Sequence, residues 1–288
     1  MRIANLIIGH KNALQLSRLV GRLEHPNFDV YIHIDKKVDI GEFRKLENSP
    51  NVFLINNRVK VNWGGNSTFT AIIKSMHEIF ESGKSYDFIN LLSAQDYPLK
   101  TSKDIFEFFM ANRERNFISF DASSESKWWK HAAARYEKYH LTDWSFPGKY
   151  LVQNVVNILA PKRNFPADMK LYGSEKSTWW SISGDCARHV IKEASGNKKL
   201  NSFLKYCWGT DEFVIATLIM NSTFKAQVVN NNLRYIDWSE GNANPKILTD
   251  KDSSALKKSE MLFARKFDIN IDSKILDEID NYNPPADE

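Results

Sequence analysis

Hydrophobic and polar positions along the first 120 residues form two kinds of segment that follow one another in turn. Nearly continuous apolar runs, typical of buried strands, cover residues 2–10, 28–35, 51–56 and 86–93. Between these runs, apolar residues recur with helical spacing over residues 12–23, 41–47 and 67–80. The alternation predicts an α/β fold with a mainly parallel central sheet flanked by helices, in which ligands bind beyond the carboxyl ends of the strands.

The second half of the chain has a less regular pattern. Residues 123–173 are rich in aromatic and basic side chains, and we expect helices and loops there that build one wall of a cleft. Residues 204–222 form the most apolar stretch, with the adjacent carboxylates Asp211 and Glu212 near its start. We expect a helix there whose first turn is capped by Thr210 or Asp211.

Composition narrows the class of protein. The chain has 288 residues, of which 42% are hydrophobic and 12% aromatic, enough for a sizeable core in one large or two fused domains. Its two cysteines, Cys186 and Cys207, lack the spacing of metal ligands, so we expect core thiols in a reducing compartment. Residues 1–16 contain no apolar run long enough for a signal peptide or a membrane span, which predicts a soluble cytoplasmic protein.

The charge pattern bears on the partners of the protein. The formal net charge is +4, and the basic residues are scattered among acidic ones, which argues against nucleic acid as a partner. A mild positive excess suits small anionic ligands such as nucleotide diphosphates, or peripheral contact with an anionic membrane surface. Eight tryptophans and ten tyrosines suit packing against sugar rings as well as packing in a core.

Polar residues follow two of the expected strands. Asp35 comes at the end of the second strand and is followed by Lys36 and Lys37, and Gln95 and Asp96 come just after the fourth. These positions lie where a parallel sheet binds its ligand. Asp35 is either an ordinary turn carboxylate or a hydrogen-bond acceptor for a nucleotide base or ribose.

A pair of glycines lies before the third expected helix. Trp63 precedes Gly64 and Gly65, and a residue without Cβ permits a positive φ or the close approach of a ligand to the backbone. A tight turn alone would also explain the pair. Asn66 or Ser67 can cap the helix that follows.

Six segments of the chain, taken together, resemble one known family. They are HIDKK (33–37), VKVNWGGNS (59–67), NLLSAQDYPLK (90–100), WGTDEFVIATLIMNS (208–222), LRYIDW (233–238) and LFARKFD (262–268). Their order and approximate spacing over residues 2–270 resemble the core-2/I-branching glycosyltransferase family, which includes the peptide O-xylosyltransferases. The resemblance implies a bacterial-type member and an inverting glycosyltransferase of the GT-A type, which uses a nucleotide-activated sugar and no metal cofactor.

The resemblance also implies a single GT-A-like catalytic domain over residues 1–288. In this interpretation residues 1–120 form the nucleotide-sugar-binding half, and residues 121–270 form the half that binds the acceptor and carries the catalytic base. A helix and a tail are expected over residues 271–288.

The metal motif common in GT-A enzymes is the sequence Asp-x-Asp. Asp250 and Asp252 match it, but they open a polar helix late in the chain, where capping is the expected role. Without a metal, side-chain cations must stabilise the leaving diphosphate. The resemblance places these cations at Lys266 and, across a gap in the alignment at a position that is often arginine in the family, at Lys246. Lys246 and Arg265 could instead lie on a solvated basic face. The residues expected to bind the nucleotide sugar are Asp35, Trp63, Gly64, Lys246, Arg265 and Lys266.

The resemblance assigns the catalytic base to Glu212, the glutamate of the segment TDEF. In an inverting transfer, one carboxylate must accept the proton of the acceptor hydroxyl as that hydroxyl attacks the anomeric carbon. Both acids could instead cap the helix, because its dipole favours carboxylates at the first turn. We expect Asp211 to cap the helix and to act as a positioning residue.

Acceptor binding is expected from polar and aromatic residues on several segments. Trp179 and Trp180 precede a strand, so one ring should face the core and the other the cleft. The residues expected to contact the acceptor are Gln95, Asp96, Arg135, Tyr136, Asp211 and Trp238.

The resemblance therefore implies an enzyme that transfers a sugar such as N-acetylglucosamine or xylose from a UDP-sugar to a hydroxyl of a glycan or lipid-linked oligosaccharide. Two alternatives stay open: a metal-dependent GT-A glycosyltransferase, and a catalytically silent protein of the same fold that binds glycans or nucleotides.

Overall fold

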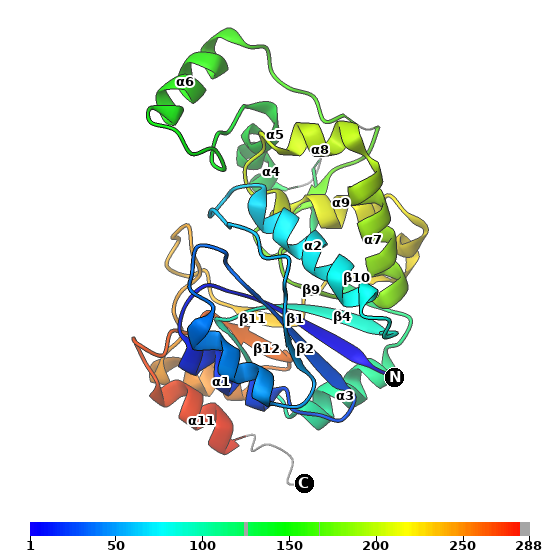
Figure 1. Cartoon of the computed structure of the whole chain (residues 1–288), viewed down its shortest axis with the longest axis vertical. Coiled ribbons are helices and arrows are strands. Elements are labelled where there is room, and N and C mark those ends of the chain that lie inside the picture. Colours follow the sequence, from blue (N-terminus) through cyan, green and yellow to red (C-terminus); the bar gives the residue numbers. More distant parts are fainter. Residues whose placement is uncertain (124–125, 167, 283–288) are drawn as a thin grey trace.

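The computed structural model describes residues 1–123, 126–166 and 168–282 as an α/β fold built on a seven-stranded sheet (Figure 1). In spatial order its strands are β10 (Val228–Val229), β6 (Asn116–Ile118), β9 (Trp180–Ser183), β4 (Phe88–Ser93), β1 (Ile3–Gly9), β2 (Phe28–Ile34) and β3 (Val52–Leu54). All pairs are parallel except those of β9, which runs antiparallel to β4 and β6. The expected α/β fold with a mainly parallel sheet is confirmed.

Helices cover both faces of this sheet, as its continuously apolar strands require. Successive side chains of a strand point to opposite faces, so Ala4 and Leu6 of β1 belong to one core and Ile3 and Ile7 to the other. The first core is closed by α2 (Ser67–Glu81), α7 (Gly184–Gly196) and α9 (Val214–Met220), and the second by α1 (Ala13–Arg22), α3 (Ser102–Ala111) and α11 (Lys274–Tyr282).

A second sheet brings the end of the chain next to the main sheet. Its middle strand β12 (Phe263–Arg265) lies parallel to β11 (Arg234–Ile236) and antiparallel to β5 (Asp96–Pro98), which follows β4 closely. Arg265 is paired in register with Asp96. The motif that contains Arg265 and Lys266 therefore lies beside the carboxyl end of β4. The short helices near these two sheets are η1 (Gly41–Asn48), η4 (Asp250–Asp252) and α10 (Ser253–Lys257).

The irregular central region consists of short helices and loops, as expected from its weak periodicity. Figure 1 shows α6 on an arm at the top of the molecule, well away from the main sheet. The elements of this region and of the segment after it are β7 (Asp121–Ala122), α4 (Lys127–Ala132), α5 (Ala134–Glu137), α6 (Lys149–Leu159), β8 (Tyr172–Gly173), α8 (Lys198–Leu204), η2 (Thr210–Glu212) and η3 (Thr223–Gln227).

The starts of two helices differ from the expectation. Asn66 occupies the cap position of α2 without a capping side-chain bond, and the carboxylate of Asp143 instead accepts hydrogen bonds from the Ser67 N–H (2.9 Å) and hydroxyl (2.6 Å). The apolar helix α9 begins only after Phe213, and no side chain in the described part of the chain caps it. The expectation that Thr210 or Asp211 caps this helix is wrong, because both residues belong to the separate turn η2.

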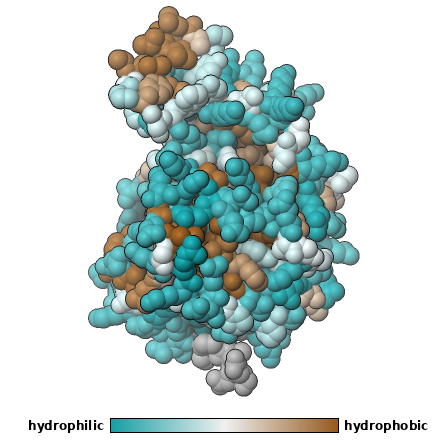
Figure 2. Space-filling model, viewed as in Figure 1, coloured by the Kyte–Doolittle hydropathy of each residue, from teal (hydrophilic) through white to brown (hydrophobic). Residues whose placement is uncertain are grey.

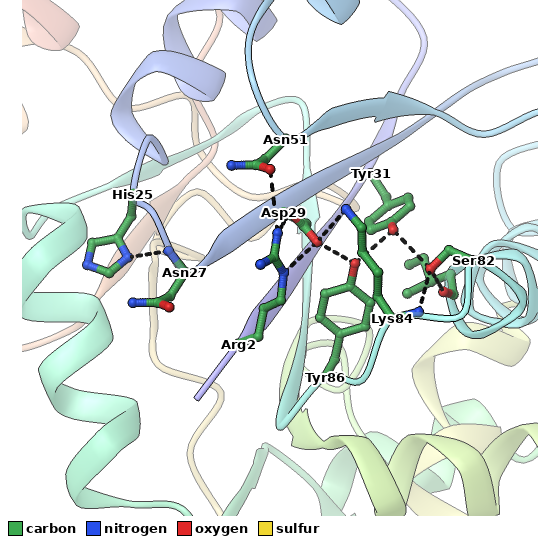
Figure 3. Close-up of polar contacts among 10 residues, drawn as sticks. Arg2, His25, Asn27, Asp29, Tyr31, Asn51, Ser82, Lys84 and Tyr86 are labelled. Carbon is green, nitrogen blue, oxygen red and sulfur yellow. Dashed lines mark hydrogen bonds and ion pairs between the residues drawn. The ribbon is translucent and has the colours of Figure 1, made fainter.

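A charged network at the amino edge of the main sheet surrounds Asp29 of β2 (Figure 3). This buried carboxylate accepts two hydrogen bonds from the Arg2 guanidinium (2.9 and 2.6 Å), one from Tyr86 (2.5 Å) and one from Lys84 (3.2 Å). Burial acts to raise the pKa of Asp29, but the hydrogen bonds from Arg2, Tyr86 and Lys84 outweigh it and hold the pKa below its usual value.

Cys186 and Cys207 are buried free thiols, as expected, and burial raises the pKa of each to about 12. None of the helices in the described part of the chain combines the length and the hydropathy needed to cross a bilayer.

Candidate active site

A cavity of about 560 Å³ opens at the carboxyl edge of the main sheet, within the size range of small-ligand sites. Ile8 and His10 line it from the end of β1, and Ser93 and Gln95 line it from the end of β4. The cavity therefore lies where a parallel sheet is expected to bind its ligand.

Segments from the rest of the chain complete the walls of the cavity. One wall comes from Trp128 and Arg135 of the irregular region, which confirms the expectation that this region lines a cleft. Nine of the predicted site residues line the same cavity: Trp63, Gly64, Gln95, Arg135, Asp211, Glu212, Trp238, Arg265 and Lys266.

The two glycines before α2 are required by close contacts within the protein. Gly64 has φ +73°, and a Cβ on it would lie 2.2 Å from the indole nitrogen of Trp208. A Cβ on Gly65 would lie 2.2 Å from the carboxylate of Asp143. Trp63 remains 64% exposed at the cavity mouth and packs edge-on against Trp208, with ring centroids 5.3 Å apart. The loop is thus shaped by Trp208 and Asp143, and Trp63 is left available to a ligand.

Glu212 lies with Asp211 and Glu175 on an acidic wall of the cavity, and its carboxylate is held by the guanidinium of Arg135. Its Oε2 accepts a hydrogen bond of 2.6 Å from Nη1 of Arg135. The Arg135 guanidinium lies near the rings of Trp128, at 4.9 Å, and Trp208, at 4.4 Å. These cation–π contacts fix the orientation of the arginine.

The acidity of this wall suits proton transfer near neutral pH. Burial raises the pKa of Glu212 to about 7, and the charges of Asp211 and Glu175 act in the same direction, whereas Arg135 acts to lower it. Burial also raises the pKa of Asp211, whose Oδ2 accepts a hydrogen bond of 3.0 Å from the Thr178 hydroxyl. A carboxylate that can gain a proton near pH 7 is well matched to the role of a general base.

A cationic wall contains Lys11, Arg265 and Lys266. Burial lowers the pKa of Lys266, and the neighbouring charges of Arg265 and Lys11 lower it further. Asp268 binds Lys11 at 2.6 Å. Like charges gathered in one place favour binding of an anion.

Arg265 is fixed from two sides. Its Nε lies 3.3 Å from Oδ1 of Asp96, and its guanidinium lies 4.3 Å from the ring of Trp179. Asp96 is fully buried and outside the cavity lining, where it also accepts a hydrogen bond of 2.7 Å from the Ser93 hydroxyl. Asp96 thus lies where it holds the Arg265 guanidinium, and its expected contact with the acceptor stays a prediction.

Two further predicted residues lie away from the cavity lining. Tyr136 packs against Trp129, Phe165 and Phe213 at the edge of a core, because its ring is directed into this aromatic cluster. Lys246 donates a hydrogen bond of 2.6 Å to Asp252. Neither side chain is among the residues that line the cavity, so their expected contacts with a ligand stay predictions.

Asp35 also lies outside the lining, with its carboxylate engaged by the backbone. Its Oδ1 accepts hydrogen bonds from the N–H groups of Lys37 (2.9 Å) and Val61 (3.3 Å). Of the two interpretations left open by the sequence, this geometry favours the turn carboxylate.

The tryptophan pair divides as expected. Trp180 is fully buried in the core, and Trp179 lines the cavity. Trp238 also lines the cavity, and its indole N–H has no hydrogen-bond partner among the described residues.

Sequence reasoning missed several residues of the cavity. His10 and Lys11 directly follow β1, as Asp35 follows β2, so the same rule about strand ends would have found them. Burial and the charge of Lys11 lower the pKa of His10. Residues 241–245, which also line the cavity, carry no pattern that marks them.

The Asp-x-Asp segment has the expected capping role. Asp252 forms a capping box with Thr249, whose N–H donates to it at 2.9 Å, and Asp252 is also bound to Lys246. Over residues 1–123, 126–166 and 168–282, no three His, Cys, Asp or Glu side chains are grouped as a metal ion would need.

A family model described as "Core-2/I-Branching enzyme" matches residues 3–261. The chain belongs to the core-2/I-branching enzyme family. Xylosyltransferase 2 of Pan troglodytes is 25% identical to this chain over an alignment 305 residues long, which covers 97% of this chain and 33% of that protein. Xylosyltransferase oxt of Drosophila melanogaster is 26% identical over an alignment 308 residues long, which covers 98% of this chain and 33% of that protein.

The chain thus spans about a third of the length of the curated relatives it matches. The crystal structure of mouse xyloside xylosyltransferase 1 aligns with a TM-score of 0.40 and 9% identity over 91% of this chain and 97% of that chain, which is too distant to add to the assignment. Core-2/I-branching enzymes are glycosyltransferases, and the sequence resemblance to this family is confirmed.

Proposed function

We propose that this core-2/I-branching family member transfers a sugar from a UDP-sugar to a hydroxyl of a glycan or lipid-linked oligosaccharide, with inversion at the anomeric carbon. One observation carries the proposal: a single cavity combines a carboxylate whose pKa is raised to about 7, Glu212, with the cations Arg265 and Lys266. Proton acceptor and diphosphate partner are the two groups that this displacement requires.

In the proposed reaction, Glu212 accepts the proton that is released and the cations stabilise the charge that develops on the leaving group. The acceptor oxygen forms a bond to the anomeric carbon while its proton passes to the Glu212 carboxylate. The bond between the anomeric carbon and the diphosphate oxygen breaks, and the electron pair leaves with the diphosphate. Lys266 and Arg265 then stabilise the added negative charge. Arg135 holds one oxygen of Glu212 and so fixes the orientation of the base.

The acceptor is proposed to bind against the aromatic residues at the mouth of the cavity. Trp238 lines the cavity, where its ring can pack against a sugar, and Trp63, which is expected from the sequence to bind the nucleotide sugar, is exposed and can also contact the acceptor. Because the relatives are named xylosyltransferases, UDP-xylose is the first donor to test, followed by UDP-N-acetylglucosamine.

The proposal includes a reaction without a metal cofactor. Its support is that Asp252 is bound to Thr249 and Lys246, while Arg265 and Lys266 supply positive charge inside the cavity. Calorimetric titration of UDP with and without EDTA should give similar affinities. A strict requirement for a divalent ion would favour the metal-dependent alternative.

Enzyme activity is tested by release of UDP from a panel of UDP-sugars, first without acceptor and then with glycan acceptors. Slow hydrolysis of one donor, accelerated by an acceptor, is the expected result. Tight UDP binding without any turnover of the panel would instead favour a silent binding protein.

A further inference from the structure

Helix α6 has an apolar side that faces solvent. None of its eleven residues is buried. Leu151, Ile158 and Leu159 expose 71%, 80% and 79% of their surfaces. Figure 2 shows hydrophobic residues gathered over the arm that carries α6 in Figure 1. The other exposed apolar residues of the helix are Tyr150, Val152 and Val155.

The polar side of α6 faces the protein instead. Lys149, Gln153 and Asn157 are spaced four residues apart and so share one face of the helix. All three side chains form hydrogen bonds of 2.8 to 3.0 Å with backbone groups of residues 139–144. These bonds fix the rotation of the helix about its axis. The apolar side cannot turn inward unless they break.

This orientation is the reverse of that in an ordinary surface helix, whose apolar stripe faces the core. A contiguous exposed apolar surface of this kind marks an interaction site. The exposed residues lie on a projecting arm and not in a groove, so a flat partner fits them better than an inserted peptide.

We propose that α6 docks into the interfacial region of an anionic lipid membrane. Residues 144–166 carry a net positive charge, because they contain Lys149, Lys162 and Arg163 but no aspartate or glutamate. Arg163 is buried and Lys149 is bound to backbone carbonyls, whereas Lys162, beside Glu137, is 79% exposed and can reach anionic headgroups. Trp144 and Phe146 are exposed at the base of the arm, and such aromatic residues favour the depth of the headgroups. An apolar helical face with flanking cations is typical of helices that lie in a membrane interface.

The base of the arm is connected to the cavity. Asp143 binds the start of α2 beside Gly65, and Trp144 stacks on Tyr206 with ring centroids 5.9 Å apart. Trp208 of the cavity lies two residues after Tyr206. A docked arm therefore holds the cavity close to the bilayer, where a lipid-linked acceptor would be presented. Only this last step rests on the proposed function.

Vesicle flotation of the purified full chain tests the docking. Mixed vesicles of phosphatidylcholine and phosphatidylglycerol should carry the wild-type protein to the top of the gradient, more weakly at high salt. The double variant I158Q/L159Q should bind the vesicles at least about tenfold more weakly, because each lost apolar contact contributes on that order. Its melting temperature should be unchanged, because both side chains are exposed.

The matched control is Leu14→Gln on α1, since Leu14 is 72% exposed but lies on another part of the protein. This variant should bind vesicles as the wild type does. Failure of the wild type to float, or equal flotation of the double variant and the wild type, would overturn the proposal, and so would equal binding to pure phosphatidylcholine. A dimer in light scattering that the double variant loses, without vesicle binding, would identify a second copy as the occupant instead. UDP binding is unaffected in every case, so these outcomes are independent of the proposed activity.

Discussion

A carboxylate lies near each end of the main sheet, with Asp29 fully buried and Glu212 partly exposed, and the two sites have opposite electrostatics. At the amino edge, Asp29 accepts hydrogen bonds from three side chains, Arg2, Tyr86 and Lys84, and its pKa is lowered. In the cavity at the carboxyl edge, Glu212 has one guanidinium beside it and a second carboxylate next to it in the chain, and its pKa is raised to about 7.

The difference shows how the surroundings of a buried acid separate a structural charge from a reactive one. Enough donors around a carboxylate keep it ionised at any physiological pH, so it can only hold structure together. Too few donors leave a carboxylate that can take up a proton, which is what a base must do. The following predictions test this contrast, beginning with the largest expected effect.

Glu212→Gln should lower turnover by about 10² to 10⁴, because the amide keeps the shape of the side chain but cannot accept the proton. Donor affinity should barely change. Steady-state rates and UDP-sugar titrations measure both quantities. Asp211→Asn is the matched control. A larger loss of turnover in this variant than in Glu212→Gln would show that Asp211, and not Glu212, is the base.

Lys266→Ala should weaken UDP binding by about 1.5 to 3 kcal/mol, since it removes a charge-assisted contact to the diphosphate. Calorimetry measures the change. Lys246→Ala is the control, because Lys246 is already bound to Asp252 outside the cavity lining. Equal losses in the two variants would bring Lys246 back into the site, and no loss in Lys266→Ala would remove Lys266 from it.

The pH profile of kcat/KM should have an acidic limb near pH 7, the value to which burial raises the pKa of Glu212. The base must be ionised, so the rate should fall about tenfold for each pH unit below this value. The residual activity of Glu212→Gln should lack the limb. A wild-type rate that stays flat down to pH 5 would show that the base is not a carboxylate of raised pKa.

Asp29→Asn should lower the free energy of unfolding by about 1 to 2 kcal/mol at pH 7, because Arg2 and Lys84 lose their charged partner while remaining partly solvated. Urea denaturation measures the loss, and turnover per folded molecule should be unchanged. The folded pKa of Asp29 lies below the ordinary value of 3.8. Its stabilisation is thus present above that value and is lost as the pH falls through the folded pKa, so the two proteins should converge in acid.

Periodicity was enough to predict the elements whose signals are local. The strands β1, β2 and β4 and the helices α1 and α2 lie within a residue or two of their predicted bounds, because each carries its own apolar run or stripe. The candidate base and the cations of the cavity came from the family resemblance, and the cavity does bring Glu212, Arg265 and Lys266 together.

Contacts between distant segments could not be predicted in this way. The carboxylate of Asp143 binds the start of α2 from 76 residues along the chain, and nothing in either sequence neighbourhood signals this pairing. A helical period also shows that a helix has two faces without showing which one meets water. Helix α6 turns its apolar face outward because the side chains of its polar face are hydrogen-bonded to the backbone of residues 139–144.

The order in which the chain is synthesised has a consequence for the second sheet. β12 is the middle strand of that sheet, and it is made long after β5, with which it pairs. A nascent or truncated chain that ends before residue 262 can contain Glu212 and most of the main sheet, but it lacks both Arg265 and the strand that covers the edge of β5. Uncovered strand edges invite pairing with other chains, so incomplete products should aggregate before they could bind a nucleotide.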